Sequence, residues 1–167
     1  DDKPQLYVIA LDGGEAARLT EMPLGVSNLR WAGHKIFFVS EVLPGYEGKL
    51  DSMKAELDRR KEKKVSAKTT EVRLFRYWDH WRTDGTVPHL CSIECKSGRG
   101  GALADLTPGW SRLLTDSGDL DYDVSPDAKE IAFSALEFGA PYDSLVNDVF
   151  LIDVTTPGAA RNITPEN

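Results

Sequence analysis

A β-hairpin with a recognisable sequence recurs along this chain, and its recurrence limits the folds that the chain can adopt. Residues 125–134 read Ser-Pro-Asp-Ala-Lys-Glu-Ile-Ala-Phe-Ser, a tight turn followed by an apolar strand. Residues 29–40 follow the same plan with a shorter turn. A second kind of hairpin, which ends on Leu-Thr or Ile-Thr, occupies residues 5–20, 88–107 and 148–164. Repetition of short supersecondary units at this scale predicts a β-propeller or a related array.

The first hairpin shows why these segments are predicted to be strands. Leu6 and Val8 alternate with Tyr7 and Ile9, so both faces of this strand are apolar. A strand that is apolar on both faces is typical of a sheet that has other layers on both sides. The glycines at positions 13 and 14 tolerate the positive φ angles of a short hairpin turn. The sequence therefore predicts that both faces of this first strand are buried.

An insertion interrupts the repeat at about residues 43–86. The interval from Thr20 to Thr107 is longer than the interval from Thr107 to Thr164, and the strand pattern stops within it. Residues 51–64 predict one helix, with Asp51 as a candidate N-cap and cations at the C-terminal end. Its apolar face is narrow and consists of Leu50, Met53 and Leu57. We expect a helix that lies on the surface or reaches toward another domain, with a solvated excursion that has no role as the alternative.

The composition excludes several classes of protein. With 167 residues, of which 41% are hydrophobic, the chain is long enough to bury the core of one domain. The net charge of −7 and the single basic run, at residues 59–64 and interleaved with Glu62, argue against nucleic-acid binding. No segment approaches the roughly 18 apolar residues of a membrane span, and no leader opens the sequence. We therefore expect a soluble chain without a nucleic-acid or membrane partner.

The cysteines predict structural thiols. Cys91 and Cys95 lie on one predicted strand, where their Cα atoms are about 13 Å apart. A disulfide tolerates a separation of no more than about 7 Å, so the two should not pair. Together with the three histidines they do not form a second ligand pair at zinc-site spacing. We expect no metal and no cofactor.

The five hairpins alternate between an outer kind, which ends on Thr, and an inner kind, which follows the plan of residues 125–134. They amount to about two and a half four-stranded antiparallel blades, whereas closed propellers contain about four to eight. An open stack would expose apolar faces and unpaired edges. The predicted fold is therefore all-β, a partial β-propeller with one inserted helix. Further sequence, or several copies of the chain in a homo-oligomer, would complete it.

On these residues the chain resembles the propeller of the prolyl oligopeptidase family of serine peptidases, in particular the dipeptidyl peptidase and acylaminoacyl peptidase branch. The resemblance rests on residues 13–20 (Gly-Gly-Glu-Ala-Ala-Arg-Leu-Thr), residues 26–31 (Val-Ser-Asn-Leu-Arg-Trp) and the Ser-Pro-Asp turn at 125–127. The charged helical excursion followed by Tyr-Trp-Asp-His-Trp at residues 77–81 is its most discriminating part. Single repeats are also similar to those of TolB-like periplasmic propellers.

The resemblance implies an N-terminal β-propeller, to which residues 1–167 contribute, over a C-terminal α/β-hydrolase domain that lies outside this chain. In such enzymes a Ser-Asp-His triad on a Gly-x-Ser-x-Gly elbow cleaves short peptides, and the propeller gates access of the substrate. Ser111 follows Gly109 at the elbow spacing, but Leu113 stands where the second glycine belongs. We therefore expect no catalytic residue in this chain, a hydrolase domain and peptide substrates as partners, and a location in the bacterial periplasm or cytoplasm.

Two other interpretations compete with the peptidase. The main rival is a TolB-like scaffold whose propeller binds another protein and has no hydrolase partner. A sugar-processing propeller with its own catalytic carboxylates is disfavoured, because no acidic pair here has a derivable separation.

Candidate site residues come from the segment after the helix. Trp78, Asp79, His80 and Trp81 are predicted to lie on the substrate side or at the domain interface, with inter-blade packing as the alternative for the two tryptophans. On one continuous strand, Trp78 and His80 would share one face, and Asp79 and Trp81 the other. We expect Trp81 with Asp79 on the functional side and Trp78 in the core.

Overall fold

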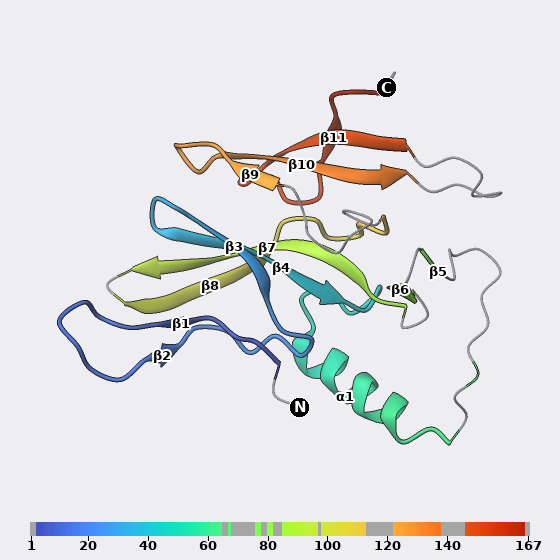
Figure 1. The fold of residues 1–167 in the computed structure, drawn as a ribbon, viewed down its shortest axis with the longest axis horizontal. Coiled ribbons are helices and arrows are strands. Elements are labelled where there is room, and N and C mark those ends of the chain that lie inside the picture. The colour runs from blue at the N-terminus through green and yellow to red at the C-terminus, as the bar shows by residue number, and fades with distance from the viewer. Residues whose placement is uncertain are drawn as a thin grey trace.

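The computed structural model describes residues 3–64, 67, 76–77, 80–81, 85–96, 98–112, 122–137 and 146–165, of which residues 76–77, 80–81 and 137 are described by their backbone. These residues form one helix and a series of strands (Figure 1). In chain order the elements are β1 (Tyr7–Val8), β2 (Ala17–Arg18), β3 (Ser27–Ala32), β4 (Lys35–Val42), α1 (Leu50–Lys61), β5 (Arg76–Tyr77), β6 (His80–Trp81), β7 (Val87–Lys96), β8 (Arg99–Asp105), β9 (Tyr122–Val124), β10 (Glu130–Glu137), β11 (Val146–Asp153) and β12 (Arg161–Asn162).

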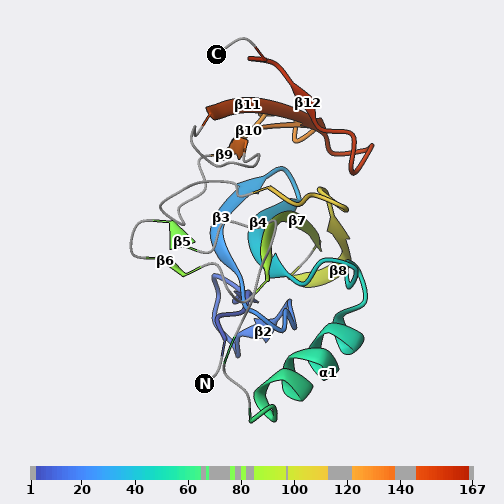
Figure 2. The ribbon, with the colours of Figure 1, turned by 90° about the vertical axis from the view of Figure 1, so that its right-hand side faces the viewer.

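Two four-stranded antiparallel sheets dominate the fold. The first sheet has the order β3-β4-β7-β8 and the second sheet the order β12-β11-β10-β9, while β1–β2 and β5–β6 form separate two-stranded sheets. Figure 1 shows the first sheet between the β1–β2 hairpin and the second sheet, and Figure 2 shows the same order of layers after a 90° turn. The predicted all-β class and the five predicted hairpins are confirmed. Within the described residues the sheets do not close into a ring.

The two sheets pack face to face around an apolar cluster. The first sheet contributes Phe37, Val39 and Leu90, and the second sheet contributes Phe133, Phe150 and Ile152, among others. The indole of Trp110 meets the rings of Phe133 and Phe150 edge-on, with centroid distances of 5.3 Å and 5.1 Å. Such edge-to-face contacts add to the stabilisation that comes from burial alone. The cluster therefore joins the two sheets into one core.

A second cluster lies on the opposite face of the first sheet. Its members are Leu6, Met22, Ile36, Phe38, Cys91, Ile93 and Cys95. Since Leu6 and Met22 belong to the β1–β2 region, this hairpin covers the outward face of the first sheet. The central strands of the first sheet, β4 and β7, are thus buried on both faces, which explains why successive residues of β4 from Ile36 to Val39 are all apolar.

The expectation that both faces of the first strand are buried is wrong for β1. Leu6 is buried against the first sheet, but Tyr7 and Ile9 are 56% and 58% exposed and Leu11 is fully exposed. The reason is position: the β1–β2 hairpin is the last layer of strands in the described stack (Figure 1). Among the described residues no strand covers its outer face, and α1 borders that face only beside Tyr7, across a groove.

The connection between β4 and β7 carries the helix. Val42 and Val87 are paired neighbours on these two strands, so residues 43–86 span a single strand-to-strand connection. The predicted N-cap is wrong, because α1 begins at Leu50 with Lys49 as its N-cap and no side-chain capping bond. Asp51 lies in the first turn instead, where its negative charge still interacts favourably with the helix dipole.

One apolar residue attaches α1 to the sheet. Met53 is fully buried in a cluster with Val42, Leu43 and Val87, and its sulfur accepts the backbone N–H of Leu43 at 3.3 Å. Leu50 and Leu57 are partly buried beside this cluster. The prediction of a surface helix with a narrow apolar face is confirmed, with the addition that Met53 enters a small core of its own.

Candidate functional site

The segment predicted to hold the site lies largely outside the described residues. Trp78 and Asp79 are not described, and His80 and Trp81 are described by their backbone as strand β6. Their assignment to the substrate side therefore stays a prediction.

The expected alternation along this segment is wrong. Tyr77 pairs with His80 and Arg76 with Trp81 in an antiparallel arrangement, so β5 and β6 are the two strands of a hairpin. Side chains alternate between faces only along one strand. Since Tyr77 and Trp81 lie on different strands, alternation does not predict which of these residues share a face. A short run of aromatic residues fits one strand or a tight hairpin equally well, which is why the sequence did not separate the two.

The three outer hairpins (β1–β2, β7–β8 and β11–β12) close with the same threonine geometry. In each, one residue near the start of the hairpin makes two hydrogen bonds through its backbone. Its N–H donates to the threonine hydroxyl oxygen, and its carbonyl accepts the N–H of the residue before the threonine at 2.8 Å. The donor–acceptor pairs at the hydroxyl are Leu6 with Thr20 at 2.9 Å, Leu90 with Thr107 at 3.0 Å, and Val149 with Thr164 at 2.8 Å. The predicted Leu-Thr and Ile-Thr endings are thus one structural unit repeated three times, and Leu6, Leu90 and Val149 are equivalent positions.

The residue before each of these positions is polar and bonds within the hairpin. Gln5 accepts the hydroxyl of Thr20, Asp148 accepts the amide of Asn162 at 2.7 Å, and His89 occupies the middle unit. The sequence patterns did not single out His89. The signal that could have found it is its place in the repeat, directly before Leu90.

His89 is the most enclosed polar group of the three. Its side chain is fully buried, with Nδ1 at 2.8 Å from a carboxylate oxygen of Asp105 and Nε2 at 3.0 Å from the backbone carbonyl of Trp110. The other oxygen of Asp105 accepts the N–H of Thr107 at 3.0 Å. Both nitrogens of the ring therefore have a partner, one on β8 and one in the segment that follows the hairpin.

This arrangement cannot serve a serine nucleophile. A histidine-aspartate pair acts as a general base when the second ring nitrogen faces the hydroxyl that it deprotonates. Here Nε2 faces the carbonyl oxygen of Trp110, and Ser111 is exposed to solvent. The geometry gives His89 and Asp105 a structural role, and it leaves Ser111 without a base among the described residues.

Both cysteines are free and buried in the second cluster. Burial raises the pKa of the Cys91 thiol, and the nearby Asp105 carboxylate adds to the effect. A thiol that stays protonated is a poor nucleophile.

We expect neither thiol to react with Ellman's reagent in the folded chain at pH 8, and both to react once the chain is unfolded in denaturant. The measurement is the absorbance of the released thionitrobenzoate over time. Rapid release from the native chain would show that the cluster around Cys91 opens in solution.

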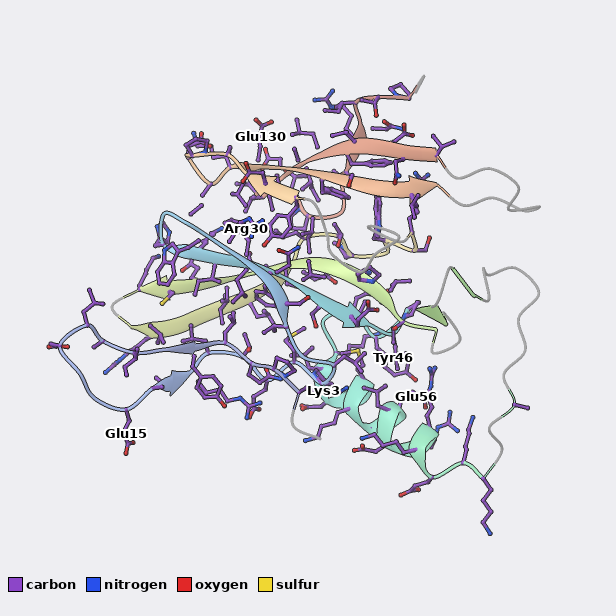
Figure 3. The ribbon with its side chains drawn as sticks, viewed as in Figure 1. Lys3, Glu15, Arg30, Tyr46, Glu56 and Glu130 are labelled. Atoms are coloured by element: carbon purple, nitrogen blue, oxygen red, sulfur yellow. The ribbon has the colours of Figure 1, made fainter. Side chains whose placement is uncertain are left out.

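A groove of about 450 Å³ separates α1 from the first hairpin. It is polar and lined by charges of both signs, including Lys3, Arg18, Asp51 and Lys54, with Tyr7 at its side (Figure 3 labels Lys3). Arg18 is already bonded to Glu21 and to the carbonyl of Thr20. The groove therefore lacks a converging set of groups that would define a ligand.

The described part of the chain offers neither a metal site nor a membrane-spanning helix. No group of three or more His, Cys, Asp and Glu side chains that could hold a metal ion occurs among the described residues. None of the helical structure described is long and apolar enough to cross a bilayer.

Several large apolar side chains are exposed at the N-terminal end of the stack, and we call them together the uncovered surface. It consists of Tyr7, Ile9 and Leu11 on the β1 side and Leu29 and Trp31 on β3. The repeat gives each β1 residue two equivalents: Ile9 corresponds to Ile93 and Ile152, which are 3% and 1% exposed. Residues that are core elsewhere are thus exposed here, which is typical of an interface.

Comparison with known proteins relates the chain to a peptidase. No family model matches it. An uncharacterized peptidase, YuxL, of Bacillus subtilis (strain 168) is 30% identical over 153 residues, which cover 90% of this chain and 21% of the relative. The chain thus spans about a fifth of that relative's length, and it is similar to one region of a larger peptidase.

Proposed function

We propose that residues 1–167 are a non-catalytic β-propeller portion of a serine peptidase that cleaves short peptides, of the dipeptidyl or acylaminoacyl type, and that this portion gates access of the substrate. The observation that carries the proposal is the threefold repeat of the outer hairpin in a chain that is similar to one region of a larger peptidase.

The packing supports the propeller. The first sheet buries one face of its central strands against the second sheet and the other against the β1–β2 hairpin. Blades of a propeller are stabilised in the same way, and closure of the ring covers the terminal faces. A ring that continues beyond the uncovered surface would bury Tyr7, Ile9 and Leu11 as their equivalents are buried.

The enclosure of the histidine-aspartate pair supports a gating role over a chemical one. His89 and Asp105 bond to each other and to backbone groups, and no base faces Ser111 among the described residues. In this proposal the triad belongs to an α/β-hydrolase domain of the same protein, and a closed propeller admits short or unfolded peptides by exclusion. The segment with Trp78, Asp79, His80 and Trp81 would face the substrate or that domain.

Residues 1–167 alone are expected not to react with a fluorophosphonate probe and not to hydrolyse dipeptidyl or aminoacyl chromogenic substrates. The complete protein that contains these residues is expected to be labelled on one serine within a Gly-x-Ser-x-Gly motif outside them. Labelling is read by gel fluorescence and the site by mass spectrometry, with Ser111→Ala as the control that should change nothing.

Two results would contradict the proposal in different ways. Stoichiometric labelling of Ser111 would place catalysis in this chain. A complete protein that is not labelled and contains no such motif would favour the TolB-like scaffold.

A further inference from the structure

We propose that β1 and the exposed face of β3 receive a two-stranded inner hairpin from the same protein, supplied by sequence outside residues 1–167, which pairs antiparallel with the open edge of β1. The inference rests on one part of the proposed function, the β-propeller built from repeated hairpins, and it does not depend on peptidase activity.

The first observation is the open edge of β1. In the two four-stranded sheets, the first strand of the outer hairpin has a partner on each side: β7 lies between β8 and β4, and β11 between β12 and β10. Among the residues that the structure describes, the equivalent strand β1 pairs with β2 alone. Since the N–H and C=O of Leu6 face the β2 side, those of Tyr7 and Ile9 face the open edge by alternation. An unpaired edge of this kind is a template for one more strand.

The second observation is the exposed face of β3. Trp31 pairs with Ile36 as Val124 pairs with Ile131, so β3 and β9 are equivalent strands, and Leu29 corresponds to Tyr122. Tyr122 is 4% exposed, whereas Leu29 and Trp31 are 48% and 61% exposed. The face of β3 thus lacks the layer that the face of β9 has.

The described structure shows what that layer is. The inner hairpin β3–β4 covers β9: the hydroxyl of Tyr122 donates to the carbonyl of Asn28 at 2.6 Å, and the Arg30 guanidinium lies 5.5 Å from the centre of the Tyr122 ring. From β4, Phe37 and Val39 enter the same cluster as Tyr122. The occupant of the β3 face is therefore an inner hairpin with large apolar side chains at the positions of Phe37 and Val39.

A second copy of this chain does not offer that hairpin. Both inner hairpins, β3–β4 and β9–β10, are already paired inside their own sheets. A copy could add the open edges of its two four-stranded sheets or of its β1–β2 and β5–β6 hairpins, but none of these brings a free inner hairpin with side chains such as Phe37 and Val39. The similar peptidase has about five times the length of the matched region, which leaves ample sequence for further hairpins of the same kind.

A graft tests the inference on the full 1–167 chain. A copy of residues 26–45 is fused to the N-terminal side of Lys3 through a Gly/Ser linker as long as the β10–β11 connection, residues 138–145. We expect the backbone amides of Tyr7 and Ile9 and the indole N–H of Trp31 to exchange with solvent at least about tenfold more slowly than in the ungrafted chain. Nuclear magnetic resonance measures all three sites, and Trp31→Phe assigns the indole signal.

The matched control is the same graft with Phe37→Asp and Val39→Asp in the copied hairpin only, which should restore fast exchange. Unchanged exchange in the apolar graft, or equal protection in the control, would overturn the inference. So would slow exchange in an ungrafted chain that sediments as a dimer, because a second copy would then cover the surface.

Hydrogen exchange of the complete protein gives an answer that does not depend on the graft. Segments that contain residues 5–11 and 27–32 should be more protected there than in residues 1–167 alone, and equal exchange would overturn the inference. Because this readout does not involve the fluorophosphonate, its failure and that of the peptidase assignment are distinguishable.

Discussion

Replacement of Ile152 by alanine is expected to lower the free energy of unfolding by about 2–5 kcal/mol, and replacement of Ile93 by a similar amount. Both side chains are buried in the clusters that join the layers of the stack. Replacement of Ile9 is expected to cost less than about 0.5 kcal/mol, because its side chain is 58% exposed. Urea denaturation followed by circular dichroism measures the three values.

The comparison is sharp because the repeat places the same residue type at three equivalent positions. Side-chain volume and the substitution itself are held constant. The surroundings differ, because Ile93 and Ile152 lie on strands with a partner on each side and beneath a neighbouring layer, whereas Ile9 follows the end of β1 and is exposed. An Ile9→Ala loss as large as the other two would mean that the outer face of β1 is covered in solution. Dependence of that loss on protein concentration would then identify self-association.

The repeat is also the part of the fold that the sequence could predict. Strand pairing follows from local patterns, since each hairpin carries its own turn residues and its own apolar strand. The Leu-Thr and Ile-Thr endings mark Thr20, Thr107 and Thr164, and these residues make the bonds that close the outer hairpins. The recurring Leu-Thr or Ile-Thr ending therefore predicts both the outer hairpins and the threonines whose hydrogen bonds close them.

Exposure of β1 could not be predicted in the same way. The residues Tyr7, Ile9 and Leu11 have the same apolar character as their buried equivalents, so the sequence describes a strand that belongs between two layers. Whether a layer is present depends on the rest of the assembly and not on the strand itself. The residues for which predicted burial is wrong, Tyr7, Ile9 and Leu11, therefore belong to the uncovered surface.

The candidate site was predictable to a smaller extent. The run of residues from Tyr77 to Trp81 predicts one strand, but Tyr77 and His80 lie opposite one another in a hairpin. His89 was missed because a single histidine on an apolar strand carries no signal of its own. Its role depends on Asp105, which lies 16 residues further along the chain and reaches it only through the pairing of β7 with β8.

Replacement of His89 by alanine is expected to lower the free energy of unfolding by about 3–5 kcal/mol, because it empties a fully buried site and leaves two hydrogen-bond acceptors without their partner. The ring is fully buried, and its loss leaves the Asp105 carboxylate and the carbonyl of Trp110 without their hydrogen-bond partner. With a total stability of about 5–15 kcal/mol for a domain of ordinary size, this change would bring the chain close to unfolding. The matched control is His34→Ala, since His34 is exposed and its replacement should leave the unfolding midpoint nearly unchanged.

A double-mutant cycle distinguishes the pair from a simple loss of packing. If His89 stabilises the hairpin through Asp105, the double variant with His89→Ala and Asp105→Ala should be much less destabilised than the sum of the single variants. Additive losses would show that the imidazole acts by filling space alone. Coupling would instead mean that the middle repeat uses an enclosed histidine-aspartate pair where the first uses the amide of Gln5 and the third the carboxylate of Asp148. The three outer hairpins would then share the threonine geometry but use a different polar side chain before the equivalent positions Leu6, Leu90 and Val149. A structural role permits such variation, whereas a catalytic role does not.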